Sequence, residues 1–227
     1  PVCESALLPG LTLKDHSVSK KKFALAACPH CLFQLTQDMP SQEAIGPFYQ
    51  SVDYISHSNT SKGLINFLYQ QVRKYTLVQK RKLIERVTGL KSGVLVDIGS
   101  GTGAFAHQMA SQGWTVSGYE PDTDARKLAR QLYQINLQPS DQWLQIAPAS
   151  VDVITLWHVL EHVHDLQGYF QHFQKILQKG GYLIIAVPNH TSYDASIYGQ
   201  FWAAYDVPRH LWHFSPTSME KLLSQYG

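Results

Sequence analysis

A glycine-rich stretch is the part of the chain whose residue types could do chemistry most directly. Asp97, Gly99, Gly101 and Gly103 lie in VLVDIGSGTGAF, residues 94 to 105, which begins with a short apolar run. A backbone without side chains turns tightly and approaches a ligand closely, because no Cβ collides with it. Glycine-rich turns follow many strands, so this pattern needs a second signal before it indicates a ligand.

The second signal is Glu120, which ends the segment TVSGYE and lies 17 residues after Gly103. An acidic side chain about 20 residues after the glycines can accept two hydrogen bonds from a ribose diol. A dinucleotide site has the pattern G-x-G-x-x-G, but here Ala104 directly follows the third glycine. Asp97 would repel a pyrophosphate, and it would suit a sulfonium ligand that carries an amino group. The residues therefore favour S-adenosylmethionine, and a nicotinamide oxidoreductase is the alternative enzyme.

These side chains need a sheet to position them, and the chain from residue 91 onward predicts one. Strands are expected over residues 94–98, 115–120, 151–159 and 181–188. Helices are expected over 103–112, 124–135 and 165–179. Strands that alternate with helices imply parallel pairing and right-handed crossovers. We therefore expect an α/β fold with a doubly wound, mostly parallel, Rossmann-like sheet and a ligand at the carboxyl ends of its strands.

The amino-terminal half predicts two further segments. Residues 1–40 hold all three cysteines, and we expect a small zinc-ribbon-like segment there. Residues 41–90 are expected to form helices and a lid, because apolar residues at helical spacing over 62–88 predict one or two helices that stop at Gly89. The S-adenosylmethionine-binding domain is then expected over residues 91–227.

Composition limits the classes of protein that this chain can represent. It has 227 residues, 44% of them hydrophobic, and a net charge of +2, which allows a real core and demands no strongly charged partner. No apolar run reaches the roughly 20 residues of a membrane span. No secretory signal is visible, so a cytoplasmic location is expected. The sequence does not indicate an oligomeric state.

Three segments, taken together, resemble the class I S-adenosylmethionine-dependent methyltransferases. They are residues 94–122, 150–165 and 177–189, and they occur in the order usual for that family. The resemblance covers about residues 90 to 227 and is nearest to the group that includes ubiquinone-biosynthesis-like methyltransferases. It is specific for cofactor and fold and says little about the acceptor. The family's sheet usually ends with an antiparallel hairpin after the helix expected at 215–227, so we expect carboxyl-terminal strands to be missing.

The resemblance implies a role for each matching position. The residues implied around the methionine part of the cofactor are Asp97, Gly99, Ser100, Gly101 and Gly103. Glu120 would hold the ribose hydroxyls, and Pro121 or Asp122 would flank the adenine. The third strand is poorly marked, and Asp141 or Gln142 is our prediction for the adenine amine. Trp157 and His158, after the fourth strand, would line the methyl-transfer pocket.

Cys28 and Cys31 form the C-x-x-C turn CPHC, which commonly gives two thiolates to one zinc ion. Cys3 is the third candidate ligand. A cysteine before Pro1 would create a second such turn, and otherwise His16 or His30 is the candidate for a fourth ligand. The alternative is three cytosolic thiols that bind no metal.

Two aromatic-rich segments hold candidate residues for binding an acceptor. In residues 201–216, Arg209 could pair with a phosphate or carboxylate and His210 could act as a general base, with Asp206 beside them. In residues 48–58, Tyr54 and His57 could reach the cofactor or the substrate. The alternative for both segments is packing, in which the polar groups satisfy one another.

The sequence HVLEH, from His158 to His162, is a third candidate site. On a helix its two histidines and Glu161 would share one face and could bind a metal. In the family that the chain resembles, a similar turn at this place usually has a structural or pocket role.

Together these patterns predict transfer of a sulfonium methyl group by SN2 displacement to an O, C or N nucleophile. The protein then mainly supplies alignment and desolvation. His158 or His210 is the candidate base. A small-molecule acceptor such as a glycan, lipid or quinone precursor is favoured. RNA methylation guided by the basic run at residues 20–22 is one alternative, and a non-catalytic cofactor-binding subunit is another.

Overall fold

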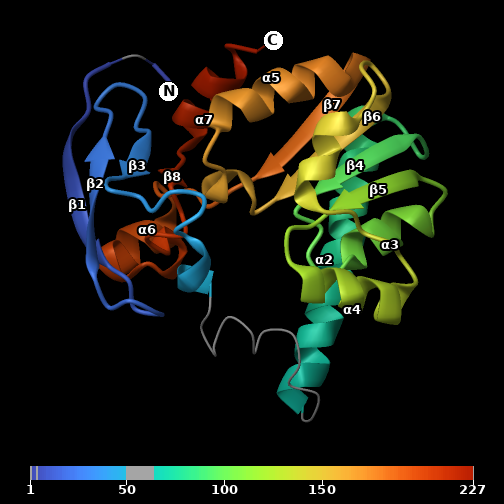
Figure 1. Ribbon diagram of the computed structural model, residues 1–227, viewed down its shortest axis with the longest axis horizontal. Coiled ribbons are helices and arrows are strands. Elements are labelled where there is room, and N and C mark those ends of the chain that lie inside the picture. Colours follow the sequence, from blue (N-terminus) through green and yellow to red (C-terminus); the bar gives the residue numbers. More distant parts are fainter. Residues whose placement is uncertain (1, 4, 50–63, 227) are drawn as a thin grey trace. The chain divides into compact units, whose positions relative to one another are not determined.

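A computed structural model describes residues 2–3, 5–49 and 64–226, with side chains from residue 70 onward in the helix that begins at 64 (Figure 1). Tyr54 and His57 lie outside the described residues. The chain divides into two compact units. One unit comprises residues 1–60, 160–168 and 187–227, and the other comprises 61–159 and 169–186. The predicted division of the chain at residues 40 and 90 stays a prediction.

The second unit contains the parallel sheet that the sequence predicts. Its strands are β4 (Val94–Ile98), β5 (Thr115–Tyr119), β6 (Val151–Trp157) and β7 (Leu177–Ala186), in the order β5-β4-β6-β7. All three neighbouring pairs are parallel. The helices are α2 (Leu64–Thr88), α3 (Ala104–Ala110), α4 (Thr123–Tyr133), the 3₁₀ helix η2 (Ser140–Gln145) and most of α5 (Leu166–Ile176). This arrangement confirms the α/β, Rossmann-like fold.

The order of the strands fixes where a ligand can bind. The chain runs from β4 to β5 on one side of β4 and then crosses to β6 on its other side. The direction in which strands are added to the sheet therefore reverses between β4 and β6. In open α/β sheets the ligand crevice lies at such a switch point, outside the carboxyl ends of the strands. Those ends carry the glycine-rich loop after Ile98 and the turn after Trp157.

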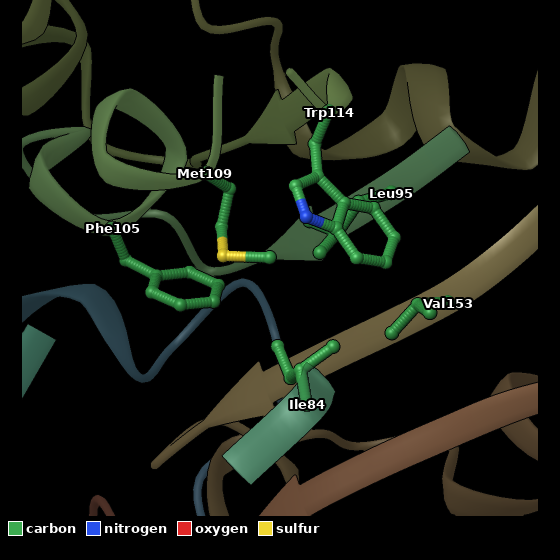
Figure 2. Close-up of a cluster of buried hydrophobic side chains, with 6 residues drawn as sticks. All are labelled: Ile84, Leu95, Phe105, Met109, Trp114 and Val153. Atoms are coloured by element: carbon green, nitrogen blue, oxygen red, sulfur yellow. The ribbon is translucent and has the colours of Figure 1, made fainter. Parts of the chain in front are cut away.

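A buried hydrophobic cluster holds two helices against one face of this sheet. Leu95 of β4 and Val153 of β6 face Phe105 and Met109 of α3, with Ile84 of α2 on the same side (Figure 2). Trp114 completes the cluster. The packing of Phe105 keeps the start of α3 directly after the glycine-rich loop, and the packing of Ile84 brings α2 to the same region.

Several element boundaries differ from the predicted ones. The helix expected to reach residue 179 ends at Ile176, because Leu177 already pairs with Val151 at the start of β7. The strand expected to reach residue 159 ends at Trp157, because His158 takes a left-handed backbone conformation with φ 59°. The third strand of the family is reduced to an isolated bridge between Tyr119 and Gln138.

The first unit contains an antiparallel sheet that the sequence did not predict. Its strands are β1 (Leu8–Lys14), β2 (Lys22–Ala27), β3 (Gln34–Thr36) and β8 (Trp212–His213), in that order. Its helices are η1 (Gly46–Tyr49), η3 (Leu160–His162), α6 (Tyr193–Tyr198), η4 (Gly199–Phe201), η5 (Ala203–Tyr205) and α7 (Pro216–Leu223). α7 confirms the helix expected within 215–227, and the hydroxyl of Ser215 caps it by accepting the N–H of Ser218. In the part of the chain that the structure describes, no helix is long and apolar enough to cross a membrane.

Candidate functional site

The glycine-rich loop is tied to the end of the neighbouring strand. The N–H groups of Gly99 and Ser100 both donate to the carbonyl of Tyr119, at 2.8 and 3.0 Å. Gly99 has φ 70°, and a Cβ there would lie 2.3 Å from a methyl carbon of Val159. A side chain at this position is therefore excluded twice, by backbone strain and by contact. Gly101 has open space around it, so a ligand can approach its backbone.

Glu120 joins the end of β5 to the same loop. It is 8% exposed, and its carboxylate accepts the N–H of Gly101 at 2.8 Å and the N–H of Asp122 at 3.0 Å. Burial raises the pKa of Glu120, and the two backbone hydrogen bonds oppose that rise. Each carboxylate oxygen has a second lone pair. The side chain is thus fixed in place and still able to accept hydrogen bonds from two hydroxyl groups.

Asp97 is the buried acid of the site. Its side chain is 1% exposed and accepts a hydrogen bond from the hydroxyl of Thr155 at 2.7 Å. Burial raises the pKa of Asp97 from 3.8 to about 6, and Thr155, Ser100 and Lys80 oppose the shift. A carboxylate held away from water is stabilised by a cation beside it. This position therefore suits the ammonium group of a ligand.

A cavity of about 410 Å³ adjoins Asp97 and the glycine-rich loop. Its wall includes Asp97, the loop from Gly99 to Thr102, Phe105 and Trp157, and α2 adds Arg73 and Lys80. Arg73 donates a hydrogen bond to the Thr102 hydroxyl at 3.0 Å. The cavity thus offers an anion, two cations and two aromatic faces. These groups fit the ammonium, carboxylate and sulfonium of S-adenosylmethionine, and Glu120 fits its ribose.

Sequence reasoning missed Arg73, Lys80, Phe105 and Thr155. The two cations are among many charged residues of α2, and the sequence does not show which face of that helix meets the cavity. Thr155 is a single polar residue within an apolar strand. A hydroxyl at a buried strand position is the signal that could have indicated a polar partner for Asp97.

The other predicted cofactor residues occupy varied positions. Trp157 and Ser100 line the cavity. His158 is exposed, and its N–H donates to the carbonyl of Ala186 at 2.9 Å. Asp141 is exposed in the first turn of η2. The carbonyl of Pro121 accepts a hydrogen bond from Arg126 at 2.7 Å. Their roles toward the cofactor stay predictions.

In the first unit, Arg209 and Asp206 form a pair within one loop. Arg209 is 3% exposed, and its Nε donates to Asp206 at 2.9 Å. The same guanidinium donates to the carbonyl of Phe48 at 2.7 Å and to the hydroxyl of Ser17 at 3.0 Å. These contacts match the packing alternative, in which polar groups of the loop satisfy one another. A role for Arg209 or Asp206 in acceptor binding stays a prediction.

His210 is hydrogen-bonded within its own segment. Its Nδ1 lies 2.8 Å from the carbonyl of Ala204, and because a carbonyl only accepts, Nδ1 donates a proton there. Its Nε2 lies 4.0 Å from a carboxylate oxygen of Asp206. The backbone carbonyl of His210 accepts a hydrogen bond from the hydroxyl of Thr36 at 2.7 Å, and that hydroxyl also hydrogen-bonds to Nε2 of His213. The role of His210 as a general base stays a prediction.

The sequence HVLEH is not helical throughout. β6 ends at Trp157, and only residues 160–162 form the 3₁₀ helix η3, so the single helical face that the metal alternative requires is absent from this stretch. Glu161 and His162 instead have ligand atoms within 4.8 Å of each other and of His210. Burial and the proximity of His210 lower the pKa of His162 to about 4. His162 is therefore neutral at pH 7.

The three cysteines lie close together. One sulfur from each of Cys3, Cys28 and Cys31 lies within 4.8 Å of the other two, and none of the three forms a disulfide. Cys28 and Cys31 are buried in the turn between β2 and β3. Among the described residues, neither His16 nor His30 joins this group.

Fold and cavity together define a class I S-adenosylmethionine-dependent methyltransferase. A family model described as "Methyltransferase domain" matches residues 69–227, and the chain belongs to that family. The sequence-based identification of this class is confirmed.

Curated relatives carry names that refer to ubiquinone biosynthesis. An O-methyltransferase of that name from Cupriavidus pinatubonensis is 29% identical over 136 residues, which cover 56% of this chain and 54% of the relative. One from Aliivibrio fischeri is also 29% identical and covers 63% of this chain and 67% of the relative. This chain spans about half the length of the first curated relatives it matches.

Solved structures agree on the fold. A methyltransferase from Archaeoglobus fulgidus superposes with a TM-score of 0.56 at 23% identity, over 71% of this chain and 73% of that one. A phosphoethanolamine N-methyltransferase from Haemonchus contortus, solved with S-adenosylhomocysteine, has a TM-score of 0.53 at 21% identity, over 66% of this chain and 37% of that one.

We predict that Asp97→Asn stabilises the ligand-free protein at high pH while weakening its binding of S-adenosylmethionine. The pKa of Asp97 is raised in the folded chain, so folding favours its protonated form. The contribution of this group to the free energy of unfolding is complete below pH 3.8 and is lost as the pH rises through about 6. At pH 8 the variant should gain roughly 1–3 kcal/mol, since one pKa unit corresponds to about 1.4 kcal/mol and the loss of attraction to Lys80 offsets part of the gain.

Urea unfolding at pH 8 and pH 4 measures this effect, and the gain should shrink at pH 4. Asp141→Asn is the control, because Asp141 is an exposed carboxylate of the same unit. Its free energy of unfolding should change by less than about 0.5 kcal/mol. A destabilised Asp97→Asn protein at pH 8 would show that the buried charge is already well compensated.

Proposed function

We propose that this chain transfers the methyl group of S-adenosylmethionine to an oxygen of a small organic acceptor, of the glycan, lipid or quinone-precursor kind. The observation that carries the proposal is the cavity in which Asp97, Arg73 and the aromatic pair Phe105 and Trp157 lie together. The names of the curated O-methyltransferases support oxygen as the nucleophile. The net charge of +2 offers little attraction for RNA.

The residues of the cavity, and Glu120 bonded to its glycine-rich loop, have separate tasks in this proposal. Asp97 binds the ammonium group, Arg73 binds the carboxylate, and Glu120 orients the ribose. When bound, S-adenosylmethionine supplies an already activated methyl group, so alignment of the acceptor is the main contribution of the protein. A hydroxyl acceptor must lose a proton, and we assign that step to His210, with His158 as the other candidate.

The experiment is a titration followed by a screen of acceptors. Calorimetry should show binding of S-adenosylmethionine and S-adenosylhomocysteine but not of NAD, and Glu120→Ala should lose that binding. Phenols, catechols, sugars and RNA are then tested for formation of S-adenosylhomocysteine. Turnover on RNA alone would establish the alternative function, and binding without turnover on any acceptor would favour a non-catalytic subunit.

On an acceptor found in that screen, His210→Ala should lower turnover by about a hundredfold, the usual contribution of a general base. Its affinity for S-adenosylmethionine should not change. His158→Ala is measured beside it, and His107→Ala, an exposed histidine of α3, is the control. Unchanged turnover in either variant removes that histidine from the role of base.

We also propose that Cys3, Cys28 and Cys31 bind a structural zinc ion. The support is the approach of three sulfur atoms to within 4.8 Å, two of them buried in one turn. Zinc prefers such thiolates in a tetrahedral set, which a fourth ligand would complete. Metal analysis of the reduced protein should find one zinc per chain, lost in Cys28→Ser and kept in His30→Ala. Metal-free protein after purification and reloading with zinc would contradict the proposal.

A further inference from the structure

Lys80 is part of the wall of the cofactor cavity. Its Nζ is 4.3 Å from the centre of the Trp157 ring and 5.9 Å from the centre of the Phe105 ring. Burial lowers the pKa of Lys80, and the charge of Asp97 opposes that shift. The ammonium group thus lies over the Trp157 ring and near Phe105, and the charge of Asp97 acts on it; all three residues belong to the wall of the cavity.

These same groups are the ones that a cationic ligand would use. S-adenosylmethionine carries an ammonium and a sulfonium, and cations bind to the faces of aromatic rings and beside carboxylates. Lys80 therefore brings a positive charge to the same aromatic rings that a cationic ligand would contact. The product, S-adenosylhomocysteine, has an uncharged thioether in place of the sulfonium. Its sulfur therefore does not compete with Lys80 for the aromatic rings.

We propose that Lys80 is a specificity-determining residue that lowers the preference of this cavity for the sulfonium donor over the thioether product. Two cations that share one aromatic face in a partly desolvated cavity repel each other. The repulsion acts on the donor and leaves the product almost unaffected. This inference rests on the cofactor site and not on the proposed acceptor.

Arg73 does not explain the same preference. It is the other cation that α2 brings to the cavity, and its guanidinium already donates to the Thr102 hydroxyl. Both donor and product carry the same carboxylate, so a residue that binds the carboxylate affects both ligands equally. The cation over the aromatic faces, in contrast, acts differently on a sulfonium and on a thioether.

The test is separate calorimetric titration of the whole chain with S-adenosylmethionine and with S-adenosylhomocysteine. Lys80→Met removes the charge and keeps a long, flexible side chain that can pack on the rings. The ratio of the dissociation constant of the product to that of the donor should rise about tenfold in this variant, the scale of removing one buried cation from beside another. Lys82→Met, an exposed lysine of the same helix, should keep the wild-type ratio within about twofold.

Other outcomes overturn the proposal. Equal weakening of both ligands in Lys80→Met would show that Lys80 binds the carboxylate or supports the fold. An unchanged ratio would show that its charge does not reach the sulfonium. Lys80→Gln repeats the comparison if circular dichroism shows that the methionine variant is unfolded. If the wild type binds neither ligand, the cofactor site itself is overturned. This result differs from binding without turnover, which would leave the cofactor site intact and mean only that no acceptor has been found.

Discussion

A carboxylate buried at the carboxyl end of β4 is the interaction on which the rest of the site depends. Asp97 is 1% exposed, and its neutral hydrogen-bond partner, Thr155, compensates only part of the cost of burying its charge. The charge of Lys80 offsets a further part, but burial still raises the pKa of Asp97 to about 6. A cationic group of a ligand would stabilise this carboxylate further. The part of the cavity beside Asp97 therefore favours a cationic group of a ligand. This explains why a sulfonium ligand suits it and a pyrophosphate does not.

The backbone around Asp97 is organised by the neighbouring strand. Two N–H groups of the glycine-rich loop donate to Tyr119, and a third donates to Glu120. The loop is thus attached to the end of β5, and the acid that would bind the ribose is attached to the loop. A change in the register between β4 and β5 would displace Glu120 relative to Asp97, so the parallel pairing of these strands holds the geometry of the site.

The parts of the site that the sequence could predict are those that lie next to strand ends. Gly99 and Glu120 each follow a short apolar run, and the carboxyl ends of parallel strands meet at one edge of the sheet. Lys80 could not be predicted in this way, because it reaches the cavity through the packing of Ile84 against Leu95 and Val153 (Figure 2). That contact joins segments far apart in the sequence.

In the fold as well, the elements marked by a local sequence pattern could be predicted, and those that depend on distant contacts could not. The strands of the parallel sheet were predictable from apolar runs between helices, with errors at boundaries such as the end of α5 at Ile176. The antiparallel sheet was not predicted. β1 is exposed along most of its length, and β8 has only two residues, Trp212 and His213, which pair with β3. Strands this short or this exposed show no alternation of apolar and polar residues that a sequence could reveal.

The most direct test of this account is an NMR titration of the side-chain carboxyl carbon of Asp97, assigned by comparison with Asp97→Asn. We expect a pKa near 6 without ligand and a lower pKa when S-adenosylmethionine is bound, because the ligand's ammonium stabilises the carboxylate. A pKa at or below the ordinary value of 3.8 in the free protein, unchanged by the ligand, would contradict the claim that Asp97 is a buried anion in need of a cation.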